Sequence, residues 1–520
     1  MHLLIEAEES LPQSTASKIN LGENPDMRVL EALQPNRVFY YFEKISEIPR
    51  GSYHTKAVSD YCVSIAKELG LAVRQDDWNN VVIRKPASKG CEHSPVFMIQ
   101  GHLDMVCEKE PDCTHDFDTE GLELLVDGDY ITANGTTLGG DDGIAIAMAL
   151  AILEDDTLVH PPLEVVFTTE EEVGMDGAIH LDTTDLHAQY LLNLDSEDEG
   201  VLTVGCAGGS TQELHKPISR ETVTGIPYQI RVHGLQGGHS GVEIQKGRIN
   251  SNKVMSTILC ELMHKTSVRI ADIHGGFKHN AIPRESEAMV LFMPGADLAQ
   301  AESVIKQVQQ LYAQAYRDSD SDIAIDFQPC GVEYKVKNGH LTELAVFSEE
   351  QQKELLQLLV TMPTGVQAMS QTIPGLPETS TNLAVLQLRE NEIYLEISNR
   401  SSQPAALTLL ENRIAEIAGY SGFSIQLQSR YPGWKYRTES LLRDSMKKLY
   451  RDLFQKDAVV EMIHAGLECG ILLEKMPDLD IVSTGPDILD IHTPQERMSI
   501  SSVARTWTYV LEILKYFAFL

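Results

Sequence analysis

Three consecutive glutamates follow an apolar run in the segment VVFTTEEEVGMDG, residues 165–177. Neighbouring carboxylates repel one another, so the triplet is either a solvated turn or lies next to a positive charge. The run before it is rich in β-branched residues and predicts a buried strand. Open α/β sheets bind ligands at the carboxyl ends of their strands, which is where residues 170–172 would then lie.

Other polar side chains follow apolar runs in the same way. His102 and Asp104 stand two residues apart in QGHLDMV, so they share one face of an extended chain. A carboxylate beside a histidine often fixes the imidazole tautomer for metal binding, although a histidine bonded to a turn explains so short a motif more simply. In TTLGGDDGIA, Asp142 fits the N-cap of a helix, whereas Asp141 is left without such an explanation.

Asp195 ends the apolar run YLLNLD, and His464 follows the strand-like AVVEMI. Each of these five segments has a simple structural explanation alone, but together they are hard to dismiss. Two histidines and three carboxylates form a nitrogen and oxygen ligand set without cysteine, which suits one or two zinc ions, or manganese or cobalt in their place. Two cations about 3.5–4 Å apart need a bridging carboxylate and hold a hydrolytic water between them.

A sheet has to bring these strand ends together. β-Branched runs at 80–85, 96–104, 163–169 and 190–195 predict strands, and two amphipathic helices precede them. A further, strongly apolar helix begins near Asp142. Strands that alternate with helices predict an α/β catalytic domain with a mostly parallel sheet.

The pattern changes after the segment GCAGG. Two rounds of strand and helix follow, which predict an inserted α+β lid domain of two ferredoxin-like rounds over residues 209–430. YPGWKY then returns the chain to a catalytic domain built from residues 31–208 and 431–520, and Thr438 fits the N-cap of its next helix. Residues 1–30 are polar and aperiodic and are interpreted as a flexible extension.

Composition excludes several classes of protein. The 520 residues exceed what one hydrophobic core usually serves, so at least two domains are expected. A net charge of −34 argues against binding to nucleic acid or anionic membranes. The eight scattered cysteines form no CxxC pair, and neither a signal peptide nor an apolar run of membrane-spanning length is evident. We therefore expect reduced thiols and a cytoplasmic protein.

Nine segments after residue 30 together resemble one family: GHLDMVCEK, GTTLGGDDGIA, FTTEEEVGMDGA, LDSEDEG, VGCAGG, GLQGGHSG, FKHNAIPRE, HAGLECG and GPDILDIHTPQER. The chain resembles the di-zinc metallopeptidases that include carboxypeptidase G and aminoacylase, most closely their aminoacyl-histidine dipeptidase (peptidase D-like) branch. The resemblance implies two zinc ions per chain. His102 and Asp195 would hold one metal, Glu172 and His464 the other, and Asp141 would bridge them.

The same resemblance implies further roles in the catalytic domain. Asp104 would orient His102, and Glu171 would be the general base that takes a proton from the water between the metals. The first glutamate of the triplet has no role in the family pattern and is interpreted as solvated, as is SEDEG after Asp195. A non-proline cis peptide is expected at Asp141–Asp142, although the family often carries asparagine at the second position.

In the lid, the resemblance implies that His239 of GGHSG reaches the active site on closure and stabilises the oxyanion. Asn280 and Arg400 are weaker substrate-binding candidates. Arg400 would grip the terminal carboxylate of a dipeptide, although a surface salt bridge explains it as well. His492 in DIHTPQER is interpreted as structural support for the metal site from outside.

The resulting expectation is a cytoplasmic metallo-dipeptidase that cleaves small dipeptides of the Xaa-His type, including β-alanyl-histidine. This substrate class rests on the resemblance alone. An N-acyl amino acid deacylase or a carboxypeptidase-like hydrolase of the same family is the first alternative, and a non-catalytic metal-binding relative is the second. Retention of a general base argues against the second, since a scaffold needs none. The sequence leaves the number of assembled chains open, with a homodimer as one alternative.

Overall fold

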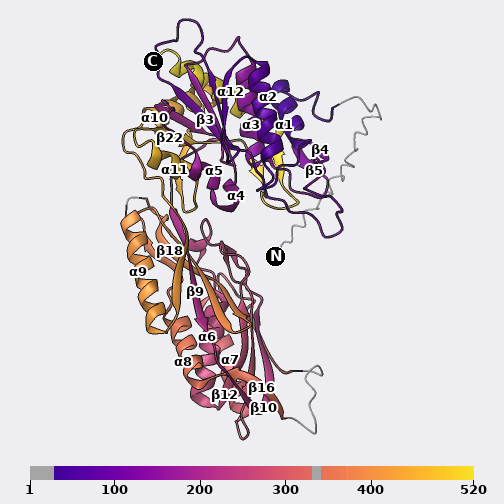
Figure 1. Ribbon diagram of the computed structural model, residues 1–520, viewed down its shortest axis with the longest axis vertical. Helices are drawn as coiled ribbons and strands as arrows, with labels where there is room; N and C mark the ends of the chain where they lie inside the picture. The colour runs from indigo at the N-terminus through magenta and orange to yellow at the C-terminus, as the bar shows by residue number, and fades with distance from the viewer. Residues whose placement is uncertain (1–27, 331–340, 372) are drawn as a thin grey trace, which may run out of the picture.

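The computed structural model describes residues 28–330, 341–371 and 373–520 (Figure 1). The predicted extension therefore lies outside the described residues up to residue 27. The molecule is elongated, with two bodies stacked along its long axis (Figure 1). The upper body contains the first and last parts of the chain, and the lower body contains the middle part.

The upper body is built on an eight-stranded sheet whose central strands are parallel. β3 pairs in parallel with β6 on one side and β7 on the other, and β7 pairs in parallel with β22. In order across the sheet the strands are β1 (Ala72–Gln75), β2 (Val81–Lys85), β6 (Leu163–Thr168), β3 (Phe97–His102), β7 (Tyr190–Asn193), β22 (Asp480–Ser483), β8 (Val201–Cys206) and β21 (Val459–Ile463). A mixed sheet with a parallel centre agrees with the α/β prediction.

Helices cover both faces of this sheet, which is why β3 and β6 are buried along their whole length. One face packs against the main core, which includes Phe39 and Phe42 of the first helix and Val510 of the last. The helices of this body are α1 (Asn36–Ser46), α2 (Lys56–Glu68), α3 (Gly140–Glu154), α4 (Glu171–Gly174), α5 (Asp176–His180), α10 (Leu441–Phe454), α11 (Glu468–Lys475) and α12 (Ile500–Phe517).

Helix α3 brings two aspartates to the sheet edge. Its side chains are apolar on all sides, so the helix is buried from Gly143 to Leu153. Asp142 lies at a kink with non-helical φ and ψ directly before the regular part of the helix, as an N-cap would, but its carboxylate does not bond to the first turn. Asp142 Oδ2 instead accepts the backbone N–H of His102 at 3.1 Å. A Cβ at Gly101 would lie 2.5 Å from the same oxygen, so only glycine permits this close approach.

The lower body is one antiparallel sheet with helices on one face (Figure 1). Its path runs β15 (Ala324–Pro329), β10 (Arg220–His233), β14 (Ser286–Phe292), β12 (Val268–Gly275), β18 (Pro377–Arg389), β19 (Glu392–Ser401), β9 (Gly208–Pro217) and β20 (Ser424–Tyr431), with β16 (Thr342–Phe347) on β10 and β17 (Gly365–Met369) on β18. The helices are α6 (Ser251–Lys265), α7 (Leu298–Ala315), α8 (Glu349–Thr361) and α9 (Pro404–Tyr420). The two predicted strand–helix rounds thus share one continuous sheet.

Smaller elements complete the two bodies. A four-stranded sheet beside the upper body comprises β23 (Ile488–Leu489), β24 (Arg497–Ser499), β5 (Tyr130–Ala133) and β4 (Leu124–Asp127). In the lower body β11 (Gly238–His239) pairs with β13 (Ala281–Ile282), and a 3₁₀ turn η1 spans Ile244–Lys246. Helix α10 is capped by Ser440 rather than by Thr438. Within the described ranges, no helix is long and apolar enough to cross a membrane.

Candidate metal centre

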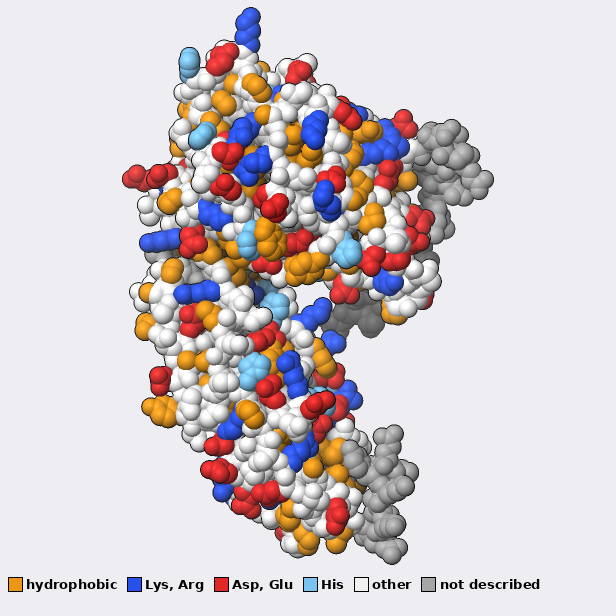
Figure 2. Space-filling model, in the orientation of Figure 1, with side chains coloured by type: hydrophobic (Ala, Val, Ile, Leu, Met, Phe, Trp, Pro, Cys, Tyr) orange, Lys and Arg blue, Asp and Glu red, His pale blue; other side chains and the backbone are white. Residues whose placement is uncertain are grey.

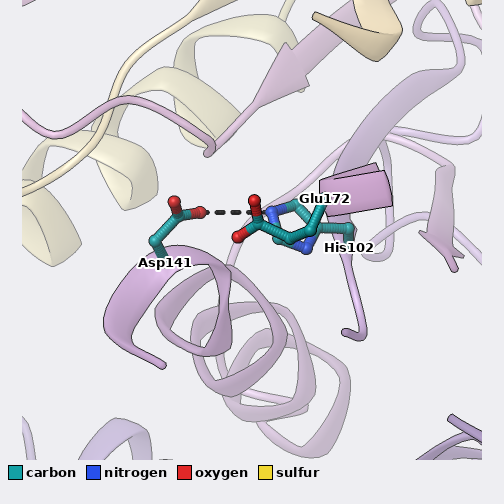
Figure 3. A group of neighbouring side chains, drawn as sticks. All are labelled: His102, Asp141 and Glu172. Carbon is teal, nitrogen blue, oxygen red and sulfur yellow. Dashed lines mark hydrogen bonds and ion pairs between the residues drawn. The ribbon is translucent and has the colours of Figure 1, made fainter. Parts of the chain in front are cut away.

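Three side chains from three elements point toward one another at the carboxyl edge of the eight-stranded sheet (Figure 3). His102 ends β3, Asp141 lies in the first turn of α3, and Glu172 lies in α4. His102 Nε2 is 3.1 Å from Asp141 Oδ1, and the ligand atoms of all three residues lie within 4.8 Å of one another. A histidine nitrogen and two carboxylate oxygens at this spacing can hold a metal ion.

Two further groups of ligand atoms overlap with the first. His102 lies within 4.8 Å of Asp142 and Asp195, and Asp141 lies within the same distance of Asp195 and Glu197. His102 Nε2 is 3.6 Å from Asp195 Oδ1. Asp141 thus belongs to two groups, one with His102 and Glu172 and one with Asp195 and Glu197. A carboxylate that bridges two metal ions needs such a shared position.

The structure separates His464, the predicted metal ligand, from the cluster. Among the described residues, no group of clustered ligand atoms includes it, and its ring forms no ion pair with a carboxylate. It follows β21, which is the edge strand of the sheet and lies three places from β7. At about 4.8 Å per strand, that separation is roughly 14 Å, too far for a shared site. His464 Nε2 instead lies 2.7 Å from Ser380 Oγ of the lower body.

His492 occupies the position that was expected for His464. Its Nε2 lies 3.2 Å from Asp141 Oδ2 and 3.1 Å from Glu172 Oε1. The residue sits between β23 and β24 with a left-handed φ of 60°, in a loop that reaches back over the sheet edge. The sequence analysis interpreted it as structural support for the metal site from outside. The useful signal was the motif DIHTPQER itself.

Asp104 holds two parts of the site together. Its Oδ1 lies 3.4 Å from His102 Nδ1 and accepts the backbone N–H of Glu171 at 3.1 Å. Its Oδ2 accepts the N–H of Glu172 at 3.2 Å and the hydroxyl of Ser52 at 2.8 Å. The carboxylate therefore lies behind the imidazole of His102, as expected, and also fixes the turn that carries two of the three glutamates.

Two supporting residues escaped the sequence analysis. The carboxylate of Glu496 accepts backbone N–H bonds from residues 138–140, the glycine loop before Asp141, at 2.8 to 3.0 Å. Arg50 is 2% exposed and donates to the carbonyl oxygens of Leu103 and Asp104. The same C-terminal loop thus supplies His492 and anchors the aspartate that His492 contacts.

Burial shifts the titration of this cluster strongly. Burial, together with the charge of Asp141, raises the pKa of Glu172 to about 7. Burial and the charges of Asp141 and Asp195 raise the pKa of Glu197 to about 8. Burial alone would lower the pKa of His492, but its contacts with Asp141 and Glu172 outweigh this effect and raise the pKa to about 11. The raised carboxyl pKa values show that the buried negative charges of the cluster are not balanced by enough positive charge.

The donor set fits divalent metal ions. Glu172 Oε1 is buried without a hydrogen bond of good geometry, so it is free to bind a cation. The only buried arginine against these carboxylates in the described part of the chain is Arg50. The carboxylates whose charges act on Arg50 are those of Glu496, Asp104, Asp142 and Asp141.

Two acidic residues that were predicted to be solvated are not. Glu170 is 5% exposed, has a left-handed φ of 59°, and accepts bonds from Tyr53 N–H and from the Thr55 hydroxyl. It closes the turn against the loop that precedes α2. Glu197 of the SEDEG segment belongs to the cluster described above. Both were misjudged because acidic runs are usually solvated and sequence alone does not show what packs over them.

A cleft of about 640 Å³ separates the cluster from the lower body. The hollow between the two bodies is visible in Figure 2. Glu172 and His492 line it from above, so the metal-binding cluster borders open space that can admit a small molecule. From the lower body it is lined by Phe277, Lys278, His279, Asn280 and Glu396.

His239 lies in the lower body, in β11. Its Nδ1 accepts the backbone N–H groups of Gly241 and Val242, both at 3.2 Å. The imidazole proton must therefore sit on Nε2, which leaves that atom as a donor. Burial, helped by the charge of Arg400, lowers the pKa of His239 to about 4. Among the described residues it makes no hydrogen bond to the clustered carboxylates.

Arg400 is 7% exposed, so the alternative of a surface salt bridge is wrong. Its Nη1 donates to the Tyr431 hydroxyl at 2.9 Å, and no carboxylate of the described residues lies within 4.0 Å of it. Its Nε is buried without a partner. Asn280 lines the cleft, and its backbone carbonyl oxygen accepts the backbone N–H of Ser240, the residue after His239. Arg400 is thus a buried guanidinium that has no carboxylate beside it in the part of the chain that the structure describes.

A parallel-centred α/β sheet with histidine and carboxylate ligands at its strand ends is the architecture of zinc-peptidase catalytic domains. The expected cis peptide is present at Asp141–Asp142. A family model described as "Peptidase family M20/M25/M40" matches residues 98–516. The chain therefore belongs to peptidase family M20/M25/M40, and the resemblance found in its motifs is confirmed.

Individual relatives agree along nearly the whole chain. The "Cytosol non-specific dipeptidase" of Escherichia coli K12 is 35% identical over 94% of this chain and 99% of its own. The crystal structure of aminoacylhistidine dipeptidase from Vibrio alginolyticus has a TM-score of 0.80, 33% identity, and covers 94% of this chain and 98% of its own. The fold is shared with the crystal structure of a tripeptidase from Staphylococcus aureus, which has a TM-score of 0.53 and 17% identity. The match covers 94% of this chain and 100% of the tripeptidase chain.

Proposed function

We propose that this protein is a metal-dependent dipeptidase. One observation carries the proposal: His102 clusters with buried carboxylates, and His492 contacts two of them, where a parallel-centred sheet meets an open cleft. In a peptidase family, such a donor set is suited to activating water for attack on a peptide carbonyl. The cleft, with a volume of about 640 Å³, suits a small substrate better than an extended polypeptide.

We assign the metal ligands as follows. His102 and Asp195 would hold one ion, Glu172 and His492 the other, and Asp141 would bridge them; His492 thus replaces the sequence-based choice of His464. The expected ions are two zinc ions per chain, with manganese or cobalt as substitutes. When bound, they would polarise the carbonyl and acidify the attacking water.

The remaining roles belong to side chains of the chain itself. Glu171 would accept a proton from the attacking water and pass it to the leaving amine. Asp104 would hold the imidazole of His102 and the turn of Glu171 in place. His239 would donate its Nε2 proton to the oxyanion when the lid closes, and this needs the neutral tautomer that its two backbone bonds select.

The substrate would be gripped at its carboxyl end. Arg400 is a buried guanidinium without a carboxylate partner, and a dipeptide supplies that group within a short distance of the scissile bond. Asn280, on the cleft wall, would donate a further hydrogen bond. We infer that the substrates are Xaa-His dipeptides, including β-alanyl-histidine. The name of the E. coli relative argues for broader selectivity in that protein, so the preference needs a direct test.

A panel of substrates tests this proposal. Zinc-loaded protein is incubated with β-alanyl-histidine, an ordinary Xaa-His dipeptide, an Xaa-Ala dipeptide and an N-acetyl amino acid, and the free amino acids are quantified. We expect release from the dipeptides, fastest for those that end in histidine. Release from the N-acetyl substrate alone would reject dipeptidase activity in favour of deacylation.

Three expectations about the whole molecule accompany the proposal. The domains would be 31–208 with 431–520 for catalysis and 209–430 for the lid, and the lid would rotate to close the cleft. We place the protein in the cytoplasm, in line with the name of its E. coli relative. A homodimer is one assembly that light scattering would distinguish from a monomer.

A further inference from the structure

A buried hydrogen-bonded chain crosses the three strands that end in the proposed metal ligands. Asn193 of β7 donates from Nδ2 to Gln100 Oε1 of β3 at 2.7 Å. Gln100 Nε2 donates to Glu468 Oε2 at 2.6 Å, and the hydroxyl of Thr168 on β6 donates to the same oxygen at 2.6 Å. All four side chains are fully buried, with exposures of 0%.

Each strand residue of this hydrogen-bonded chain stands two or three positions before a proposed ligand or the base. Gln100 precedes His102 by two positions, Asn193 precedes Asp195 by two, and Thr168 lies three residues before Glu171. In register, Gln100 lies opposite Asn193, and His102 opposite Thr168. The backbone ladders pair these strands, and Gln100 Nε2 also donates to the Thr168 hydroxyl at 3.1 Å. The buried side chains thus add a second set of links directly beneath the strand ends.

Glu468 is the member of this hydrogen-bonded chain that comes from outside the three strands. It is the first residue of α11, which belongs to the segment that follows the lower body in sequence. Its Oε2 is the common acceptor of the chain, whereas its Oε1 is buried without a hydrogen bond. A buried carboxylate with one idle oxygen is costly, so a purely structural filler would be better served by an apolar side chain.

We propose that Glu468 is a positioning residue for the metal centre. It accepts hydrogen bonds from Gln100 of β3 and Thr168 of β6, and Gln100 links it to Asn193 of β7. The side chains beneath His102, Asp195 and the Glu171 turn are thereby held in one arrangement. This inference rests on the proposed function, because it assumes that these residues bind metal. Glu468 itself touches neither metal nor substrate in this arrangement; it acts through Gln100 and Thr168.

The test measures the zinc dissociation constant of purified variants by competition with a chromophoric chelator. Glu468→Leu keeps the volume but removes the common acceptor, and we expect zinc affinity to fall about 10- to 100-fold, the usual effect of losing a partner behind a ligand. Glu468→Gln keeps an acceptor oxygen for Gln100 and Thr168 and places its amide where Oε1 has no partner. Glu468→Gln should therefore bind zinc as tightly as the wild type does.

A second readout separates positioning from general destabilisation. The visible absorption spectrum of the cobalt-substituted protein reports ligand geometry, and we expect it to change in Glu468→Leu but not in Glu468→Gln. Glu164→Leu is the matched control. Glu164 is a 3%-exposed carboxylate at the opposite end of β6 that accepts the backbone N–H groups of His187 and Ala188. Its loss should lower thermal stability and leave zinc affinity and the cobalt spectrum unchanged.

Every outcome decides the proposal. If Glu468→Leu folds and binds zinc as tightly as the wild type with the same cobalt spectrum, Glu468 does not position the ligands. If Glu468→Leu does not fold, Thr168→Val removes the two bonds that the Thr168 hydroxyl makes with Glu468 and Gln100, at nearly constant volume. Weaker zinc binding supports the proposal, and unchanged binding overturns it. A wild-type protein that binds no zinc would instead reject the proposed function.

Discussion

The choice between His492 and His464 as a metal ligand can be decided with two alanine variants. His492→Ala removes an imidazole nitrogen that lies 3.2 Å from Asp141 Oδ2 and 3.1 Å from Glu172 Oε1. Loss of a partner behind a ligand already costs 10- to 100-fold in metal affinity, so loss of a ligand itself should reach about 100-fold or more. That factor corresponds to about 2.8 kcal/mol of binding free energy at one of the two sites.

His464→Ala should behave in the opposite way. Its side chain is 3% exposed and its Nε2 contacts Ser380 Oγ at 2.7 Å, so its removal leaves a buried hydroxyl unpaired. We expect a loss of about 1–3 kcal/mol in the free energy of unfolding and no loss of metal. Elemental analysis after gel filtration gives the metal content of each variant, and denaturant unfolding gives the stability. Full metal content in His492→Ala together with depletion in His464→Ala would refute our assignment.

Other variants test the remaining roles. Glu171→Gln should abolish turnover yet keep the metal content, because only proton transfer is removed; substantial turnover would disprove the general-base role. Asp141→Ala should lose metal from both sites. His239→Ala should lower kcat about 10²–10³-fold with little change in metal content, as expected for an oxyanion donor, and unchanged turnover would exclude that role. In NMR titrations, His239 should stay neutral with its proton on Nε2 until the pH falls to about 4, so its protonation should not limit activity at pH 6; a charged imidazole at pH 6 would contradict this.

Much of the site followed from sequence because one physical rule governs it. Apolar runs that end in His102, Glu171 or Asp195 predicted parallel strands, and the carboxyl ends of adjacent parallel strands share an edge. Asp141 was found because a single helix cap could not account for two aspartates. Local pattern therefore sufficed wherever the residue stood directly at a central strand end.

The failures share a different cause. His464 also follows a strand, but the order of strands in the sheet puts β21 at the edge, and sequence periodicity carries no information on that order. Glu496 and Arg50 act from loops, through long-range contacts that no local pattern indicates. His492 was noticed in the motif DIHTPQER but was assigned to the outside of the site. Glu170 and Glu197 read as solvated because burial depends on what packs over them from distant parts of the chain.

The most direct test of the central claim is a metal titration. Metal-free protein is titrated with zinc while the release of free histidine from β-alanyl-histidine and from an ordinary Xaa-His dipeptide is followed. The di-metal assignment predicts no release without metal, a rise as zinc is added, and a plateau near two equivalents per chain. Hydrolysis that persists in the fully chelated protein, or protein that takes up two equivalents and cleaves no dipeptide, would contradict it.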